Sequence, residues 1–297
     1  MNIKNKELLS NIGLVFVAII WGFAFIAIKF TVGSIPPFYT ISFRFTIASI
    51  ALVVIFFNKL KQIKKHELIE GIIIGVFAYS GYLLQNIGLE YTTASNSSFL
   101  AVTDVVMVPF LYWFISKNKP DIYQISAGIF VMIGVGLLTL KENFTMSYGD
   151  LITLFGTLGF SMHMIFIDKY TEKTDPMILV IIQILTCAIL GNVTAFCVEG
   201  PYDFDNLTKL SIFGILFLGF ISTLITLSLQ NICQKYTKPV NAALILSSQT
   251  IFATLFAITI LGEVLTQKMI FGCILIFIGI ILCQTKPNLF ALLKKEA

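Results

Sequence analysis

The chain has 297 residues, of which 57% are hydrophobic and only 12% are charged, and its formal net charge is +4. Typical soluble domains carry about 25% charged residues. The composition therefore excludes a soluble globular enzyme, a disordered chain and a secreted disulfide scaffold, and it indicates an integral membrane protein. The small, scattered positive charge does not predict nucleic-acid binding.

Apolar segments separated by glycine, proline and charged residues predict ten membrane-spanning helices. Each has about the ~20 residues that cross ~30 Å of hydrocarbon. Pro109 lies inside the fourth span and is expected to kink it. The predicted fold class is all-α integral membrane, with spans at residues 11–30, 38–57, 69–89, 94–116, 122–140, 149–168, 176–198, 208–230, 239–261 and 267–285.

The placement of lysine predicts the orientation of these spans. With the N-terminus inside, fifteen lysines fall on inner segments, whereas the outer loops carry only Lys141, Lys209 and Lys268. An even number of spans returns the C-terminus to the same side. We therefore expect a multi-pass protein of the cell inner (plasma) membrane with both termini in the cytoplasm.

The chain contains an internal repeat. When it is shifted by 145 residues, seven of the thirteen positions in residues 84–96 are identical to residues 229–241. At a shift of 140 residues the first and sixth spans align more weakly, through Lys29 and Lys169. Residues 1–145 and 146–297 are thus predicted to be two five-helix units. Because five is odd, the second unit starts on the opposite side of the membrane, an inverted arrangement that is common in secondary transporters.

Short motifs carry a resemblance to a known family. The motifs lie at residues 21–29, 43–45, 88–94, 96–99 and 261–263 and at Gly272 and Gly279. In their order and spacing they resemble EamA-type members of the drug/metabolite transporter superfamily.

The fourth span departs from this family pattern. It ends in Lys117 and Asn118, where the second half has Gly262 and Glu263. A role of Glu263 in capping or loop anchoring is therefore not duplicated in the first half.

This resemblance implies a secondary transporter that moves amino acids, other metabolites or drugs without ATP hydrolysis. It also implies a cavity lined by the first, third, fourth, sixth, eighth and ninth spans. It does not determine the substrate.

Two charged residues inside predicted spans are candidate functional groups, because a charge at membrane depth is costly. Asp104 has three open interpretations: it binds a substrate ammonium group, carries a proton, or is the counter-ion of Arg44. Its repeat counterpart is Gln249. Arg44 is expected to have a gating or structural role, with binding of a substrate carboxylate as the alternative. Lys29 is assigned the same gating or structural role, with membrane-interface snorkelling and an anion-attracting rim both open.

Other polar and aromatic residues at membrane depth complete the candidate substrate-binding set. Amides in the third and eighth spans either line the cavity or bond neighbouring helices. Aromatic rings suit apolar or cationic solutes. Besides Asp104 and Gln249, the set is Trp21, Tyr79, Tyr82, Gln85, Asn86, Gln230, Asn231 and His163.

The sequence therefore predicts a secondary transporter that moves a small metabolite by alternating access, most plausibly an amino acid or similar amphiphilic solute. Export is the expected direction, and proton coupling through Asp104 stays open. With two histidines and no clustered catalytic residues, we expect no enzymatic activity, metal or cofactor. The expected partners are the solute and membrane lipid, not nucleic acid, and oligomeric state is not predicted. The alternative is a non-transport membrane enzyme or a structural or receptor partner.

Overall fold

A computed structural model describes residues 3–61, 63–117, 119–120, 122–139, 146–237 and 239–285. In these residues the protein is helical and contains no strand. The elements are α1 (Ile3–Thr31), α2 (Pro37–Ile55), α3 (Phe57–Leu60), α4 (Lys65–Tyr91), α5 (Ala94–Ala101), α6 (Asp104–Ser116), α7 (Ile122–Thr139), α8 (Tyr148–Thr171), α9 (Pro176–Glu199), η1 (Phe204–Asn206), α10 (Lys209–Leu216), η2 (Phe217–Ile225), α11 (Thr226–Gln234), α12 (Pro239–Ser247), α13 (Gln249–Phe256), η3 (Ala257–Leu261) and α14 (Gln267–Thr285).

Each predicted span falls on one helix or on one run of consecutive helices, which confirms the all-α membrane fold. The fourth span is α5 with α6, the eighth is α10, η2 and α11, and the ninth is α12, α13 and η3. Eight of the spans are long and apolar enough to cross a membrane, and α7 and α14 contain the shorter apolar helices 125–137 and 267–279. Residues 140–145, at the predicted boundary between the halves, lie outside the described residues.

The surface of the bundle is apolar and its interior holds polar groups, the reverse of a soluble protein. Met132, Phe196 and Phe271 are 73%, 65% and 63% exposed, as expected for side chains that face lipid. Arg44 is only 1% exposed, and Asp104 is also buried. Polar groups are therefore gathered inside the protein, where they can bind one another or a solute.

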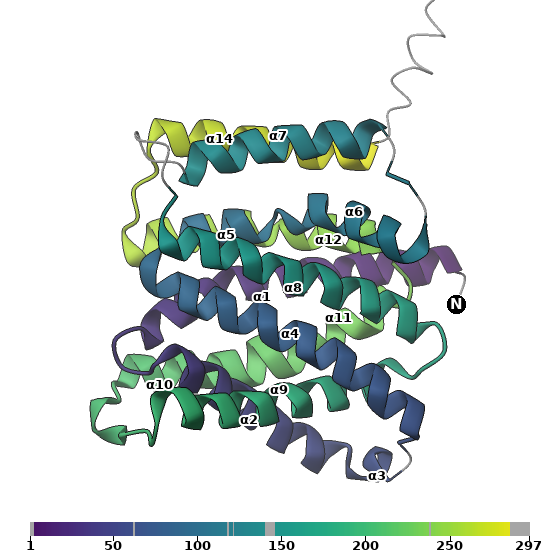
Figure 1. The fold of residues 1–297 in the computed structure, drawn as a ribbon, viewed down its shortest axis with the longest axis vertical. Coiled ribbons are helices and arrows are strands. Elements are labelled where there is room, and N and C mark those ends of the chain that lie inside the picture. Colours follow the sequence, from purple (N-terminus) through teal and green to yellow (C-terminus); the bar gives the residue numbers. More distant parts are fainter. Residues whose placement is uncertain are drawn as a thin grey trace, which may run out of the picture.

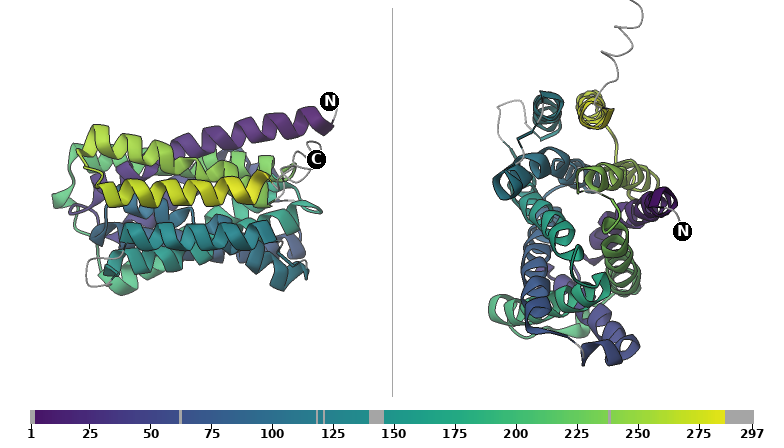
Figure 2. Two further views of the ribbon diagram at one scale, coloured as in Figure 1. Left: turned by 90° about the horizontal axis from the view of Figure 1, so that it is seen from above. Right: turned by 90° about the vertical axis from the view of Figure 1, so that its right-hand side faces the viewer.

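The helices pack in pairs that follow a two-fold relation between the halves. The third span, α4, packs on the sixth, α8, and correspondingly α10 and α11 of the eighth span pack on the first, α1. Likewise α2 packs on α9, and α7 packs on α14. The pair α7–α14 lies at one edge of the bundle and packs on α5, α6 and α12 (Figures 1 and 2). Helices of one half thus pair mainly with helices of the other half.

The two ends of the bundle differ in charge. The connections at residues 32–36, 92–93, 200–208 and 262–266 contain no lysine, and we call this end the lysine-poor face. The opposite end, on the right in Figure 1, is the lysine-rich face, formed by the connections around residues 56–64, 117–120, 172–175 and 235–237. Its lysines include Lys59, which pairs with Asp175 at 2.8 Å.

Asp175 also starts α9, because its carboxylate accepts the N–H of Met177 at 2.8 Å. Burial alone would raise the pKa of this carboxyl group. The hydrogen bonds from Lys59 and from the N–H of Met177 outweigh burial and hold its pKa below the ordinary value. The contact between Lys59 and Asp175 therefore ties α3 to the start of α9.

The fourth and ninth spans are both interrupted at their middle. Thr103 and Ser248 bond backward by only three residues, from N–H to the carbonyls of Leu100 at 3.1 Å and Ile245 at 3.2 Å. Their hydroxyls donate to the same two carbonyls, each at 2.7 Å. These tight turns separate α5 from α6 and α12 from α13.

The interruption of the fourth span lies before Pro109, and the kink expected at Pro109 itself stays a prediction. The helix α6 continues through Pro109, and the interruption lies about six residues earlier, at Val102 and Thr103. The second half has Thr254 at the position of Pro109 and is interrupted at the equivalent place. The interruption is thus a feature of both repeats and does not require proline.

Candidate functional site

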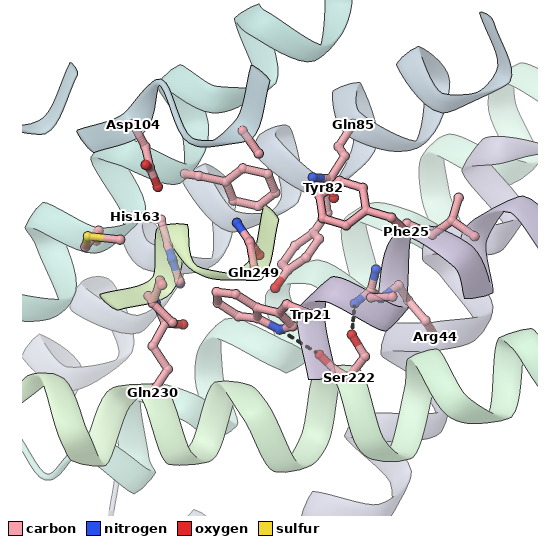
Figure 3. Close-up of a pocket in the computed structure, with 16 residues that line it drawn as sticks. Trp21, Phe25, Arg44, Tyr82, Gln85, Asp104, His163, Ser222, Gln230 and Gln249 are labelled. Atoms are coloured by element: carbon pink, nitrogen blue, oxygen red, sulfur yellow. Dashed lines mark hydrogen bonds between the residues drawn. The ribbon is translucent and has the colours of Figure 1, made fainter. Parts of the chain in front are cut away.

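A pocket lies between the two halves, at the level of the interrupted helices (Figure 3). The space between its wall atoms is about 620 Å³, and the centres of water molecules reach about 50 Å³ of it. That room suits a few waters, so a metabolite requires the walls to separate. The lining residues are Trp21, Ala24, Phe25, Ile28, Arg44, Tyr82, Gln85, Ala101, Asp104, Phe160, His163, Met164, Ser222, Gln230, Leu246 and Gln249.

The lining comes from the six spans that the family resemblance implies, and also from the second span through Arg44. Of the ten candidate substrate-binding residues, seven line the pocket. Asp104 and Gln249 begin α6 and α13, directly after the two interruptions. The first N–H groups of the two helices are bonded to the preceding turns, as Val105 donates to Val102 and Ile251 to Ser248.

Polar atoms of the pocket are left without protein partners. In the part of the chain that the structure describes, Asp104 Oδ1 and Gln230 Oε1 have no hydrogen-bond partner. Both side chains are buried, and a buried polar atom without a partner costs about 1–3 kcal/mol. These oxygens are therefore available to donors on water or on a solute.

Arg44 is held by the eighth span and by an aromatic ring. Its Nε donates to Thr223 Oγ1 at 2.9 Å, and its guanidinium lies 4.5 Å from the centre of the Tyr82 ring. A second guanidinium nitrogen lies 3.5 Å from Ser222 Oγ. Thr223 and Ser222 belong to the π-helical segment η2, and such segments are frequent at functional sites.

The interpretation of Asp104 as a direct counter-ion of Arg44 is wrong. Across the described residues no ion pair joins them, and Figure 3 shows them on opposite sides of the pocket, with Tyr82 and Gln249 between them. The buried cation and the buried carboxylate thus face one cavity without neutralising each other. Because uncompensated buried charges are costly, this arrangement favours a ligand that contacts both.

Trp21 forms one wall of the pocket and is locked in place. Its indole N–H donates to Thr226 Oγ1 at 2.8 Å and to the Ser222 carbonyl at 3.2 Å. Phe160 meets Tyr82 edge to face, with ring centres 4.9 Å apart. The pocket therefore combines rigid aromatic walls with a few polar groups, as small-molecule sites commonly do.

His163 lines the same pocket from α8 and bonds away from it. Its Nε2 lies 2.9 Å from Gln183 Oε1, which accepts, so the Nε2 proton is used between α8 and α9. The His163 ring thus both lines the pocket and links α8 to α9.

Three candidate substrate-binding residues do not line the pocket. The Tyr79 hydroxyl bonds Thr194 Oγ1 at 2.5 Å, between α4 and α9. Asn231 donates to the Leu227 carbonyl of its own helix at 2.8 Å. Asn86 is buried next to Gln85 in sequence but points elsewhere, because successive helical residues do not share a face. Lys29, for which a gating or structural role was expected, donates to carbonyls at the end of α4.

Sequence reasoning missed several residues at the site, among them Phe160, Ser222 and the neighbouring Thr223. Phe160 is one of 28 phenylalanines, and nothing in its sequence context separates it from a lipid-facing ring. Ser222 and Thr223 lie in an apolar span, where small hydroxyl residues are ordinary packing residues. Their contact with Arg44 depends on how η2 packs on α2. The one sequence feature that could have indicated this contact is the adjacent hydroxyl pair Ser222 and Thr223, together with a buried arginine, Arg44, in another span.

Comparison with known proteins agrees with this architecture. The model of the EamA-like transporter family matches residues 8–140 and 147–285. A protein of Archaeoglobus fulgidus described as an uncharacterized transporter is 34% identical over 281 residues, which cover 95% of this chain and 87% of the relative. The uncharacterized transporter YoaV of Bacillus subtilis is 23% identical over 276 residues, covering 91% of this chain and 94% of that protein.

A solved crystal structure shares the fold. It superposes with a TM-score of 0.70 at 15% sequence identity, over 93% of this chain and 97% of the other chain. Two matches to one family model, one in each half, and relatives that span nearly the whole chain leave the family in no doubt. The chain belongs to the EamA-like transporter family, within the drug/metabolite transporter superfamily, and is a multi-pass membrane transporter.

Proposed function

We propose that this protein is a secondary transporter that moves a small metabolite across the plasma membrane by alternating access between its two halves. The observation that carries the proposal is the pocket at the interface of the halves, with Asp104 and Gln249 at equivalent helix interruptions. Binding sites at such interrupted helices, near the middle of the membrane, are typical of transporters built from inverted repeats.

The charges of the pocket support a substrate that carries both signs. Asp104 on one side suits an ammonium group, and Arg44 on the other suits a carboxylate. Trp21 and Phe160 between them suit an apolar or aromatic side group. An amino acid or a similar amphiphilic solute fits these features better than a sugar, which needs many hydrogen-bond donors and acceptors on all sides.

The lysine-rich face is assigned to the cytoplasm, because lysine and arginine are enriched in cytoplasmic loops. Both termini then lie in the cytoplasm. Export is the proposed direction. Asp104 is proposed to carry a proton in exchange for the substrate, since this residue lines the pocket and has one buried carboxylate oxygen without a partner in the described residues.

Uptake into proteoliposomes tests the proposal. The purified protein is screened against amino acids and related metabolites, with and without a pH gradient, beside the variant Asp104→Asn. Substrate uptake that depends on the gradient in the native protein but not in the variant supports proton exchange. Gradient-driven uptake that the variant retains would remove the proton-carrier role, and absence of uptake for every solute class would contradict transport.

A further inference from the structure

Lys29 closes the lysine-poor end of α4. Its Nζ donates to the carbonyls of Leu89 at 2.5 Å and Thr92 at 2.6 Å. The last carbonyls of a helix lack intrahelical donors and carry a partial negative charge, so a lysine there is doubly favourable. The contact ties the end of the first span to the end of the third.

Two further contacts hold the same connection from the other half. The Thr92 hydroxyl donates to the carboxylate of Asp150 on α8. Glu263, after η3, accepts the N–H groups of Ala94 at 2.9 Å and Ser95 at 3.2 Å, where α5 begins. At the lysine-poor face, the connection between α4 and α5 is thus bonded by groups from both halves.

The repeat relation identifies the residues that would form the equivalent contacts on the lysine-rich face. Lys169 is the counterpart of Lys29, and Gln234 and Thr237 are the counterparts of Leu89 and Thr92. One of these contacts already exists, because Thr237 Oγ1 donates to Asn11 Oδ1 on α1 at 3.0 Å, as Thr92 does to Asp150 on α8.

The lysine contact of this second set is not made. Lys169 is exposed, and its ammonium lies over the rings of Phe166 and Tyr170 on its own helix, 5.7 and 5.6 Å from their centres. Gln234 is buried, and neither of its side-chain polar atoms has a partner among the described residues. Equivalent lysines therefore have different contacts on the two faces.

We propose that Lys29 and Lys169 are alternating latches of the transport cycle. Lys29 holds the end of α4 in this structure, and we assign this contact to the state in which the lysine-poor face is closed. When the cycle reverses, Lys29 releases the carbonyls of Leu89 and Thr92. Lys169 then leaves the rings of its own helix and donates to the carbonyls of Gln234 and Thr237. The inference rests on the proposed alternating access and assigns its two states to one pair of residues.

The physical basis is differential binding of each lysine in the two states. A contact shifts a conformational equilibrium only by the difference in its free energy between the states. Each latch makes two charge-assisted hydrogen bonds in one state and exchanges them for weaker contacts in the other. Loss of one latch should shift the population by roughly tenfold.

Accessibility of the pocket to a thiol reagent tests the latches without measuring transport. The five native cysteines are replaced, and Ala101→Cys places one thiol in the pocket. A membrane-impermeant cationic methanethiosulfonate is applied from each side of vesicles. A separate single-cysteine protein, Asp203→Cys on the lysine-poor face, reports which side faces outward.

We expect Lys29→Met to raise labelling from the lysine-poor face by roughly tenfold, and Lys169→Met to lower it while raising labelling from the lysine-rich face. Lys29→Arg keeps the donors and should label like the parent. Lys209→Met and Lys173→Met, exposed lysines on the same two faces, are the matched controls and should have no effect.

Each outcome has a defined meaning. If both faces give labelling that neither Lys29→Met nor Lys169→Met changes, the latches are wrong while alternating access stands. If the pocket thiol is labelled from one face only in every variant, alternating access and the latches both fail. Because Lys169 is exposed, its variant retains the fold and keeps the test decisive even if Lys29→Met does not fold.

Discussion

Asp104 and Gln249 occupy equivalent positions in the two halves, and each is the first residue after a helix interruption. Both line one pocket, yet one is a carboxylate and the other a neutral amide. The repeat thus preserves the backbone geometry of the site, while the charge is confined to one half. This asymmetry gives the pocket a polarity that an exact duplication would lack.

Replacing Asp104 with asparagine should separate stability from function. Its Oδ1 has no partner in the described part of the chain, so removing the charge should leave the midpoint of thermal unfolding unchanged or raise it. Transport should fall at least about tenfold, the equivalent of one charge-assisted contact. The exposed Asp205→Asn is the control. A large loss of thermal stability in Asp104→Asn would show that the carboxylate has a structural role.

Arg44→Lys should lower stability before any substrate is added. The lysine ammonium cannot both reach Thr223 as Nε does and stack on the Tyr82 ring. We expect a loss of about 1–3 kcal/mol in the ligand-free protein, measured by denaturation in detergent. Thr223→Val closes a double-mutant cycle, and additive effects of the two substitutions would show that the contact contributes nothing.

Gly22→Ala should disturb the contact between α1 and α13 just where Gln249 begins. A Cβ at Gly22 would lie 2.6 Å from Phe252 Cβ and 2.9 Å from the Gln249 carbonyl oxygen. Overpacking of this kind costs about 1–3 kcal/mol, and transport should fall with it. Gly128→Ala is the matched control, because its nearest atom, Val106 Cγ1, would lie 3.2 Å away. Equal effects of the two substitutions would contradict this account.

Lys117→Gly should stabilise the protein. Lys117 ends α6 in the left-handed conformation, with φ of 59°, and its counterpart Gly262 ends η3 with φ of 68°. A residue with a Cβ pays about 1–2 kcal/mol there, whereas glycine does not. The midpoint of thermal unfolding should rise in Lys117→Gly and stay unchanged in Lys119→Gly. A fall in Lys117→Gly would mean that the lysine side chain holds the helix end.

The sequence predicted the fold in detail because its signals are local. Hydrophobic length gave the ten spans, and proline placed helix starts such as that of α9 at Pro176. Glu263 was expected to cap or anchor, and it does so at Ala94 and Ser95. The interruption at Thr103 was not predicted, because the turn there is stabilised by a hydroxyl–carbonyl bond that no proline signals.

The site was predicted only in part, because periodicity does not say which neighbour a side chain meets. Gln85 and Asn86 are adjacent amides, and only Gln85 reaches the pocket. Arg44 and Asp104 are both buried charges, and nothing in the sequence says whether they pair. That outcome depends on the packing of α2 against η2, which turns Arg44 toward Thr223.

The sequence by itself determined the membrane class, the ten spans, the repeat and the two charges at membrane depth, since composition and spacing carry those directly. Only the tertiary structure decided that the charges face one cavity unpaired, that Trp21 is locked against Ser222 and Thr226, and that Lys29 holds α4 while Lys169 holds no such helix end. These depend on contacts between spans far apart in the chain, and such contacts follow from how the helices pack against one another.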